Sequence, residues 1–430
     1  MRGRLLARGD QGYEEQRRDA VWNARRPARY PDLILCAADA DDVAAGVRLA
    51  AERDLKVGIR SGGHSWIANG IRHGGLTLDL SALASIDYDP ATQLVSVGPA
   101  ARSADIDAEL ERHGRFFPAG HAPSVGVGGF ALGGGYGWNA RVHGPACLNI
   151  VAADVVLADG RLVRADDEVM WALRGAGPGF FGVVVRLHLR TYERPAIHRA
   201  VRVFPLAALD EVVAWSQKIA PGLPAALETV VKIGAPPGAA ESVVSVVSTA
   251  FDDPALLAAL DDIGPRPLGG KQPWPLTMRE IYAESGAAWS EQGLRWKLDG
   301  IWTDGPTVGV VDGVRDMVAG IPGPDSFVFV MPWGHVAAGV PAAWSVQAAN
   351  YVSPVAAWRE ARDDARHCAW VTGSMVAMTH LSAGVQFSDA DPASRPDHGL
   401  SAEAAARLER LRERYDPGRL FNSYLTAADL

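Results

Sequence analysis

Two glycine-rich stretches carry the side chains best suited to chemistry in this sequence. The first, IRSGGHSWIANG at residues 59–70, places His64 and two glycines directly after a run typical of a β-strand. The second, PAGHAPSVGVGGFALGGGYGWNARVHG at residues 118–144, contains eight glycines between positions 120 and 137. Glycine runs let backbone N–H groups approach a phosphate closely, because no Cβ stands in the way. Together the two stretches predict a site for a cofactor that carries a pyrophosphate.

The two common phosphate-binding motifs do not explain the second stretch. A Rossmann motif needs G-x-G-x-x-G between a strand and a long helix, with an acidic residue about twenty positions later. GVGGFA at residues 126–131 fits that spacing loosely, but its surroundings do not read as strand, turn and helix. The sequence also lacks G-x-x-x-x-G-K-[ST]. A phosphate site of another architecture is expected, and a Rossmann-type NAD enzyme is the competing interpretation.

Composition limits the class of protein and its partners. The chain has 430 residues, of which 48% are hydrophobic and 21% charged, with a formal net charge of −8. This acidic balance argues against a nucleic-acid or anionic-membrane partner. No window of twenty residues is uncharged and apolar, and Cys36, Cys147 and Cys368 show no metal-type spacing. We expect a reduced, cytoplasmic protein without a metal.

The first 195 residues alternate between signals for helices and signals for short strands. Residues 41–54 have apolar side chains at helical spacing, and residues 103–114 predict a helix with Ser103 as its N-cap. β-rich runs predict strands at residues 56–60, 75–81, 93–99 and 181–195, and a hairpin within residues 151–165. This mixture indicates an α+β domain.

The remainder of the chain has a different pattern. Residues 197–385 alternate strand candidates with amphipathic helices, which predicts a second domain built on one antiparallel sheet backed by helices. Residues 401–417 predict a charged helix whose arginines form a solvated face, namely Arg407, Arg410, Arg412 and Arg414. Tryptophans in this part are core residues in one interpretation and walls of an aromatic pocket in another: Trp333, Trp344 and Trp358.

Four motifs give the sequence a specific resemblance. In order along the chain they are RSGGHSW at 60–66, GHAPSVGVGGFALGGGYGWNAR at 120–141, WALRGAGPGFFGVVV at 171–185 and YDPGRLF at 415–421. They resemble the FAD-linked oxidases of the berberine-bridge-enzyme group, within the vanillyl-alcohol-oxidase/PCMH flavoprotein superfamily. The resemblance covers nearly the whole chain but is weak in the middle.

The resemblance implies a division into domains. It predicts an α+β fold in which residues 1–195 form a PCMH-type FAD-binding domain and residues 196–395 form an inserted substrate-binding domain, with its antiparallel sheet backed by helices. Residues 396–430 would return to the FAD domain. The flavin would then lie at the interface, where large ligand pockets are common.

The resemblance also assigns cofactor contacts. In that family the histidine matching His64 is joined covalently to the 8α-methyl group of FAD. Many relatives add a second bond from a cysteine, but Ala122 holds that position here, so one bond is expected. Cys147 lies outside the motif and is expected in the core. The residues expected around FAD are Arg60, Ser61, Gly62, Gly63, His64, Ser65, Gly120, His121, Val125, Gly126, Gly128, Gly129, Gly133, Gly134, Gly135, Tyr136, Gly137, Val183 and Asn422.

The sequence offers several candidates for the catalytic base. Relatives often carry a Tyr-x-Asn stretch before the C-terminal helix, and its tyrosine can serve as base. The matching stretch, AGVQFSDAD at residues 383–391, contains Val385 and Gln386 but no tyrosine, so the usual base is missing or comes from elsewhere. Tyr351, His380 and Tyr424 are the preferred candidates, and His335 and His121 have suitable chemistry too.

The implied function is an oxidase that takes a hydride at flavin N5 from a small alcohol, sugar, phenol or amine, an intermediate of secondary metabolism. Val125 lies where a valine goes with oxidase behaviour, so O₂ would be the acceptor and H₂O₂ the product, although ordinary packing also explains this valine. A dehydrogenase with another acceptor, a flavoprotein for a non-redox cyclisation or isomerisation, and a non-catalytic flavin-binding protein remain alternatives. A monomer or homodimer is expected, and the Ala/Arg/Gly usage suggests a bacterium with G/C-rich DNA.

Overall fold

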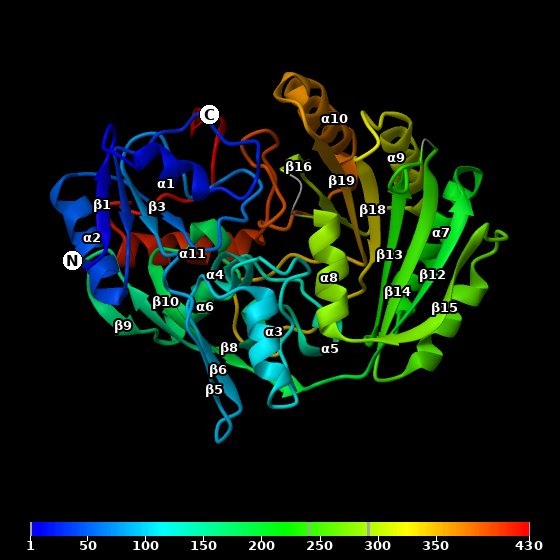
Figure 1. Ribbon diagram of the computed structural model, residues 1–430, viewed down its shortest axis with the longest axis horizontal. Helices are drawn as coiled ribbons and strands as arrows, with labels where there is room; N and C mark the ends of the chain where they lie inside the picture. Colours follow the sequence, from blue (N-terminus) through cyan, green and yellow to red (C-terminus); the bar gives the residue numbers. More distant parts are fainter. Residues whose placement is uncertain (1, 240, 290–292, 430) are drawn as a thin grey trace.

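Four sheets and the helices around them form two halves of the molecule, at the left and right of Figure 1. The computed structural model describes residues 2–239, 241–289 and 293–429. The left half contains the N-terminal strands and the C-terminal helix, and the right half contains one large sheet with helices on its outer face. The α+β class expected from the sequence is confirmed.

A four-stranded sheet leads into the first glycine-rich stretch. Its order is β1-β2-β4-β3, with β1 antiparallel to β2 and the other pairs parallel. Helix α2 packs on it through Val43 and Val47, and Asp39 caps this helix by accepting a 3.0 Å hydrogen bond from the Asp42 N–H. The bounds are β1 Arg4–Ala7, α1 Tyr13–Asp19, β2 Leu33–Cys36, α2 Ala40–Glu52, β3 Val57–Arg60 and β4 Leu76–Asp79.

A five-stranded antiparallel sheet forms the second layer of this half, in the order β5-β6-β10-β8-β9. The predicted hairpin is confirmed, because β8 and β9 pair across the turn at Asp159–Gly160. A two-stranded sheet joins β7 to β11. The bounds are β5 Ile86–Asp89, β6 Leu94–Val97, α3 Ser103–Glu111, β7 Arg115–Phe116, α4 Val127–Leu132, α5 Ala140–His143, β8 Ile150–Val156, β9 Leu162–Arg164, α6 Asp167–Leu173, β10 Val183–Arg190 and β11 Tyr192–Glu193.

The right half is built on an eight-stranded sheet whose strand pairs are all antiparallel. Seven strands follow the order β15-β12-β14-β13-β18-β19-β16, and β17 pairs with β19. The bounds are β12 Ile197–Pro205, α7 Leu209–Ile219, β13 Leu227–Gly234, β14 Val243–Phe251, β15 Gly269–Leu276, α8 Met278–Trp289, β16 Arg295–Leu298, β17 Ile301–Thr303, α9 Thr307–Ala319, β18 Phe327–Pro332, β19 Asn350–Trp358 and α10 Asp364–Ala377.

The two faces of the large sheet have different neighbours. On β13, Leu227 and Val231 pack into the apolar cluster that includes α7 and α9. Glu228 and Val230 alternate with them and point to the opposite face, because successive side chains of a strand project to opposite sides. That opposite face is turned towards the glycine-rich stretches, so this sheet supplies a roof over them.

The C-terminal segment returns to the left half. Helix α11, Ala402–Tyr415, packs against the five-stranded sheet through Leu408 and Leu411 (red in Figure 1). Beyond it, Phe421 forms a parallel bridge to Val57, which donates a 2.8 Å hydrogen bond from its N–H to the carbonyl of Leu420. The end of the chain thus pairs with β3, the edge strand that leads into the His64 loop.

Three local expectations can be compared with these elements. Ser103 is not the N-cap of α3, because Arg102 holds that position and the Ser103 hydroxyl donates to the carbonyl of Val125. Arg412 is not solvated, since it is buried beside Asp416 and donates to the carbonyl of Phe421. Cys147 is fully buried, as expected.

Candidate active site

A cavity of about 530 Å³ lies between the glycine-rich stretches and the inner face of the large sheet. Its floor comes from the first stretch and the second stretch, and its roof from β13, β16, β18 and β19. The segment of residues 386–392 and the C-terminal Asn422 and Tyr424 close it further. Elements from both halves therefore meet at one cavity.

The two glycine-rich stretches cross at Gly62 and Gly126. A Cβ on Gly62 would lie 2.6 Å from the backbone nitrogen of Gly126, and a Cβ on Gly126 would lie 2.6 Å from the Cα of Gly62. Real Cβ atoms do not approach backbone this closely, so only glycine allows the crossing. Both glycines line the cavity, and a glycine-rich wall of this kind lets backbone N–H groups approach phosphate oxygens closely.

Arg60 supplies a fixed positive charge at this floor. Its Nη1 donates a 2.9 Å hydrogen bond to Asp79, whose side chain is buried, and its Nε donates to the carbonyl of Ala20. A guanidinium held in this way is a suitable neighbour for a pyrophosphate, because it pays little conformational entropy when an anion binds.

His64 lies on the cavity wall in a state suited to covalent attachment. Its Nε2 is 3.0 Å from the Ser124 hydroxyl, and its ring stacks on Trp22 with centroids 4.8 Å apart. Burial lowers the pKa of His64 to about 4, with a further contribution from the positive charges of Arg60 and Arg102. The imidazole is therefore neutral near pH 7, and its Nδ1 makes no hydrogen bond within the described ranges.

Most residues expected around FAD line this cavity. They are Arg60, Ser61, Gly62, Gly63, His64, Ser65, Gly120, His121, Val125, Gly126, Gly128, Gly129, Gly133, Tyr136 and Asn422. Ala122 lines it too, at the position where relatives place a cysteine.

Four expected contacts lie outside the cavity wall: Gly134, Gly135, Gly137 and Val183. The glycines serve chain packing instead. A Cβ on Gly137 would lie 2.2 Å from the carbonyl oxygen of Ala119, and one on Gly135 would lie 2.6 Å from the Cβ of Ala146. Val183 is buried in the core, and its two neighbours line the cavity in its place, because side chains alternate along the strand.

The histidines proposed as bases separate into two groups. His380 lies on the surface, where its Nδ1 is 3.0 Å from the carbonyl of Ala377, and it does not line the cavity. His335 is exposed as well and lies outside the cavity wall. His121 does line the cavity, in edge contact with Trp138, and burial lowers its pKa to about 4.

The two proposed tyrosines both line the cavity, with different partners. The Tyr424 hydroxyl donates a 2.7 Å hydrogen bond to the carbonyl of Ala176, which ties it to the backbone. The Tyr351 hydroxyl, on β19, donates a 3.0 Å hydrogen bond to the carboxylate of Asp389. Only Tyr351 therefore has a partner that can take up a proton.

Asp389 is a site residue that the sequence did not single out. Its other oxygen accepts a 3.2 Å hydrogen bond from the indole N–H of Trp66, and burial raises its pKa to about 6. Burial, reinforced by the negative charge of Asp389, raises the pKa of Tyr351 as well. The available signal was its place in the 383–391 stretch, three residues after Gln386, because this stretch matches the one expected to carry the base.

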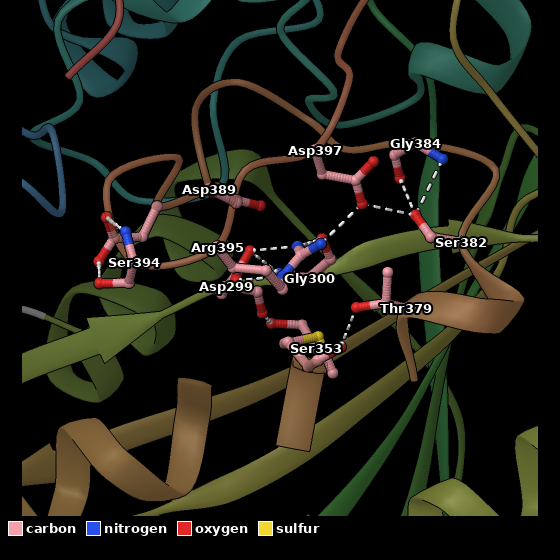
Figure 2. Close-up of polar contacts among 12 residues, drawn as sticks. Asp299, Gly300, Ser353, Thr379, Ser382, Gly384, Asp389, Ser394, Arg395 and Asp397 are labelled. Carbon is pink, nitrogen blue, oxygen red and sulfur yellow. Dashed lines mark hydrogen bonds and ion pairs between the residues drawn. The ribbon is translucent and has the colours of Figure 1, made fainter. Parts of the chain in front are cut away.

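Close packing and ion pairs hold this pair in position. A Cβ on Gly300 would lie 2.3 Å from the Tyr351 hydroxyl, so a glycine is needed for the ring to fit. Figure 2 shows Arg395 between Asp299, which it contacts through two 2.9 Å hydrogen bonds, and Asp397 at 2.6 Å. This buried network anchors the segment carrying Asp389 to the turn between β16 and β17.

Aromatic side chains form much of the remaining wall. Trp22, Trp66, Trp302 and Trp333 line the cavity, so the pocket interpretation applies to Trp333. Trp344 packs behind it and donates a 2.7 Å hydrogen bond to Tyr136, and Trp358 stacks on His367 under α10.

A smaller chamber of about 70 Å³ shares part of this wall. It contains Glu228, which accepts a 2.5 Å hydrogen bond from the Asn139 N–H, and Arg199, which pairs with Glu284. Burial raises the pKa of Glu228 to about 7. Several water molecules or a small polar group would fit a chamber of this size.

These features fit FAD. The crossing at Gly62 and Gly126 with Arg60 suits a pyrophosphate, and the neutral His64 suits attachment to the ring. No three His, Cys, Asp or Glu side chains of the described residues cluster as a metal site, and no described helix is long and apolar enough to span a membrane.

Comparison with known proteins agrees with this assignment. A family model described as an FAD binding domain matches residues 31–166. FAD-linked oxidoreductase janO of Penicillium janthinellum is 30% identical over 414 residues, covering 93% of this chain and 92% of that protein. Because this relative is fungal, the likeness does not support the bacterial source suggested by the amino-acid usage.

Two solved structures show the same fold. The crystal structure of 6-hydroxy-D-nicotine oxidase from Arthrobacter nicotinovorans has a TM-score of 0.86 at 22% identity, covering 99% of this chain and 98% of that one. BBE-like 1 of Physcomitrella patens has a TM-score of 0.84 at 19% identity, covering 98% and 96%. The chain is an enzyme of the FAD-linked oxidoreductase family, with the fold of the berberine-bridge-enzyme-like proteins of the PCMH/vanillyl-alcohol-oxidase superfamily.

Proposed function

We propose that this enzyme is an oxidase that holds one FAD through a single covalent bond to His64 and oxidises a small organic molecule. The observation that carries the proposal is one cavity with a neutral, stacked His64 on its floor and the Tyr351–Asp389 pair on its roof. Bound FAD would supply hydride acceptance at N5 and the return of electrons to O₂ as H₂O₂.

The residues of the chain bind the cofactor and cover the substrate. Arg60 and the crossing glycines bind the pyrophosphate, while His64 anchors the ring. We propose that residues 1–195 and 396–430 hold the cofactor and that residues 196–395 cover the substrate. Placing the reaction between two halves excludes bulk water from it.

Tyr351 is positioned to handle the substrate proton. Because its hydroxyl hydrogen points to Asp389, the lone pairs of its oxygen are free to accept a proton from a substrate O–H or N–H. Asp389, with a pKa near 6, is ionised at neutral pH and can take up the proton that Tyr351 releases. This pair replaces the base that relatives take from the Tyr-x-Asn stretch.

Three further features support the finer parts of the proposal. Ala122 offers no thiol at the cavity wall, which favours one covalent bond over two. Val125 lines the cavity, where a small side chain leaves room for O₂. The three free cysteines suit a reducing, cytoplasmic compartment.

Acid precipitation of the purified protein tests the proposal. A yellow pellet whose intact mass is raised by one FAD, together with bleaching by substrate without air and recovery of colour with peroxide release in air, is expected. A yellow supernatant over a white pellet would contradict the covalent bond. Bound flavin that no substrate bleaches would contradict the oxidase assignment and favour non-redox use of FAD.

A further inference from the structure

The charged groups of the cavity are few and unequally placed. Among the lining residues that the structure describes, Asp389 is the only one with a carboxylate and Arg60 the only one with a permanent positive charge. Arg60 is already paired with Asp79. His64 and His121 are neutral near pH 7, because burial lowers both pKa values to about 4.

The lysine and arginine that form ion pairs in the 386–398 segment are paired with carboxylates other than Asp389. Arg395 lies between Asp299 and Asp397, and Figure 2 shows Asp389 without a contact to this network. Lys297 is paired with Asp391. No ion pair reaches Asp389 from any described residue.

The hydrogen bonds that Asp389 receives come from neutral groups, the Tyr351 hydroxyl and the Trp66 indole. They satisfy its lone pairs in part but do not neutralise its charge. A buried carboxylate without a counter-charge is unfavourable, because burial removes the water that would solvate the ion. The raised pKa of Asp389 expresses this cost.

The wall around Asp389 is aromatic. Trp302 lies with its ring centroid 5.0 Å from that of Tyr351, and Trp66 lies on the other side of the carboxylate. Aromatic faces attract cations through their quadrupole, most strongly where water is excluded. A carboxylate between aromatic rings is the recognition chemistry for a substituted ammonium group.

We propose that the substrate of this cavity is an amine that binds as a cation, its ammonium group seated against Asp389 and between Trp66, Trp302 and Tyr351. This inference rests on the proposed function and narrows its substrate class. A neutral sugar or alcohol would leave the carboxylate uncompensated. After binding, the ammonium N–H can pass its proton to Tyr351 as Tyr351 releases its own to Asp389, which frees the nitrogen lone pair.

The groups that face Asp389 define the pH behaviour. They are Tyr351 on β19, Tyr136 beyond Trp302, and Asp299 in the β16–β17 turn, whose negative charge raises the pKa of Asp389. Both tyrosines stay neutral in the ordinary range, because burial raises their pKa values. Asp389 is therefore the group whose titration near pH 6 switches cation binding on.

The test compares two probes of equal shape with the holoenzyme. Choline carries a quaternary ammonium where 3,3-dimethylbutan-1-ol carries a neutral carbon, so their affinities differ only through charge. Binding is followed by tryptophan fluorescence and by the flavin absorbance. At pH 8 we expect choline to bind about 10-fold to 100-fold more tightly. The preference should fall below about pH 6.

Variants identify the group responsible. Asp389→Asn should abolish the preference, while Glu228→Gln, which removes the buried carboxyl of the smaller chamber, should retain it. Equal affinity for the two probes, or a preference that survives in Asp389→Asn, would overturn the inference. If Asp389→Asn does not fold, the pH dependence of the preference for choline in the unsubstituted enzyme tests the inference.

Failure of the proposed function would look different. A protein without bound flavin, or with flavin that no substrate bleaches, would contradict the oxidase assignment whatever the probes do. A flavoprotein bleached by neutral sugars or alcohols, with no preference for choline, would leave the oxidase assignment intact and overturn only the amine.

Discussion

The hydroxyl of Tyr351 and the carboxylate of Asp389 lie 3.0 Å apart, although 38 residues separate them along the chain. Tyr351 projects from a central strand of the roof, and Asp389 comes from an irregular segment that crosses it. The direction of the hydrogen bond matters, because a tyrosine that gives its hydrogen to a carboxylate can receive another from a substrate.

Removing either member of this pair should slow the chemical step. We expect Tyr351→Phe and Asp389→Asn each to lower kcat by about 10²-fold to 10⁴-fold, since general-base assistance contributes that much. The rate of flavin reduction in anaerobic stopped-flow experiments measures the effect on the chemical step. Tyr424→Phe is the control, because Tyr424 is tied to the carbonyl of Ala176, and its effect on the reduction rate should be far smaller. Equal effects of the three substitutions would contradict the roles.

The pH dependence of flavin reduction should report Asp389. The carboxylate must be ionised to accept a proton, and burial raises its pKa to about 6. The rate should therefore rise with pH up to about 6 and level off above it. In Asp389→Asn the acidic limb should disappear. A limb that persists in this variant would assign the ionisation to another group.

Replacing His64 should release the cofactor from the protein without unfolding it. In His64→Ala the mass of the denatured protein should equal that of the polypeptide alone, and flavin should appear in the acid supernatant. His113→Ala, which changes an exposed histidine just after α3 that does not line the cavity, is the matched control and should keep the covalent flavin. Covalent flavin in His64→Ala would place the bond elsewhere.

The Arg395 network should contribute strongly to stability. Arg395→Met leaves Asp299 and Asp397 buried without their partner, and breaking a buried ion pair in this way costs about 3–5 kcal/mol. Urea unfolding of the holoenzyme measures the loss. Arg419→Met removes a solvent-exposed pair with Glu409 and should change the free energy of unfolding little. Similar losses in the two variants would contradict the assignment.

Glu228 should destabilise the fold at neutral and alkaline pH. Its folded pKa of about 7 exceeds the ordinary value of 4.5, because burial outweighs the charges of Arg141 and Arg199. The folded state therefore binds more protons between these values, and stability falls as pH rises through this window. We expect Glu228→Gln to stabilise the protein by about 1–3 kcal/mol at pH 8 and to have little effect near pH 4.5.

A carboxyl with the opposite shift provides the control for Glu228. A hydrogen bond from Arg419 lowers the pKa of Glu409, so its ionised form favours the folded state. Glu409→Gln should therefore gain no stability at pH 8, and its small effect should have the opposite sign to that of Glu228→Gln. Denaturation measured at both pH values separates the two signs, and a Glu228→Gln variant that is less stable at pH 8 would contradict the prediction.

The cofactor loops could be predicted from the sequence because their requirements are local. Gly62 and Gly126 must be glycines because a Cβ on either would collide with the backbone of the other. The glycine-rich motifs that contain them already indicate such a close approach. The glycine runs also predicted FAD contacts at Gly135 and Gly137, but these two residues lie outside the cavity wall. The missing Cβ atoms there make room for protein backbone and side chains and not for a ligand. Glycine spacing alone does not distinguish the two uses.

The substrate side could not be predicted, because its contacts depend on tertiary structure. His380 has suitable chemistry, but a surface turn after α10 carries it away from the cavity. Asp389 has an ordinary sequence context, and only the roof strand beside it gives the carboxylate a role. The neighbours of Arg412 in sequence likewise suggest a solvated side chain, yet it is buried and donates a hydrogen bond to the carbonyl of Phe421 in the C-terminal segment.

The bridge between Phe421 and Val57 affects how the protein is made. The N-terminal strands leave the ribosome long before the segment that pairs with the edge of their sheet is synthesised. Val57 and its neighbouring strand therefore lack this partner until more than 360 further residues have emerged. Contacts of such sequence separation slow folding and expose intermediates to aggregation. The proposed attachment of FAD to His64 would then be a late event, and chains truncated before residue 420 should depend on chaperones and remain colourless.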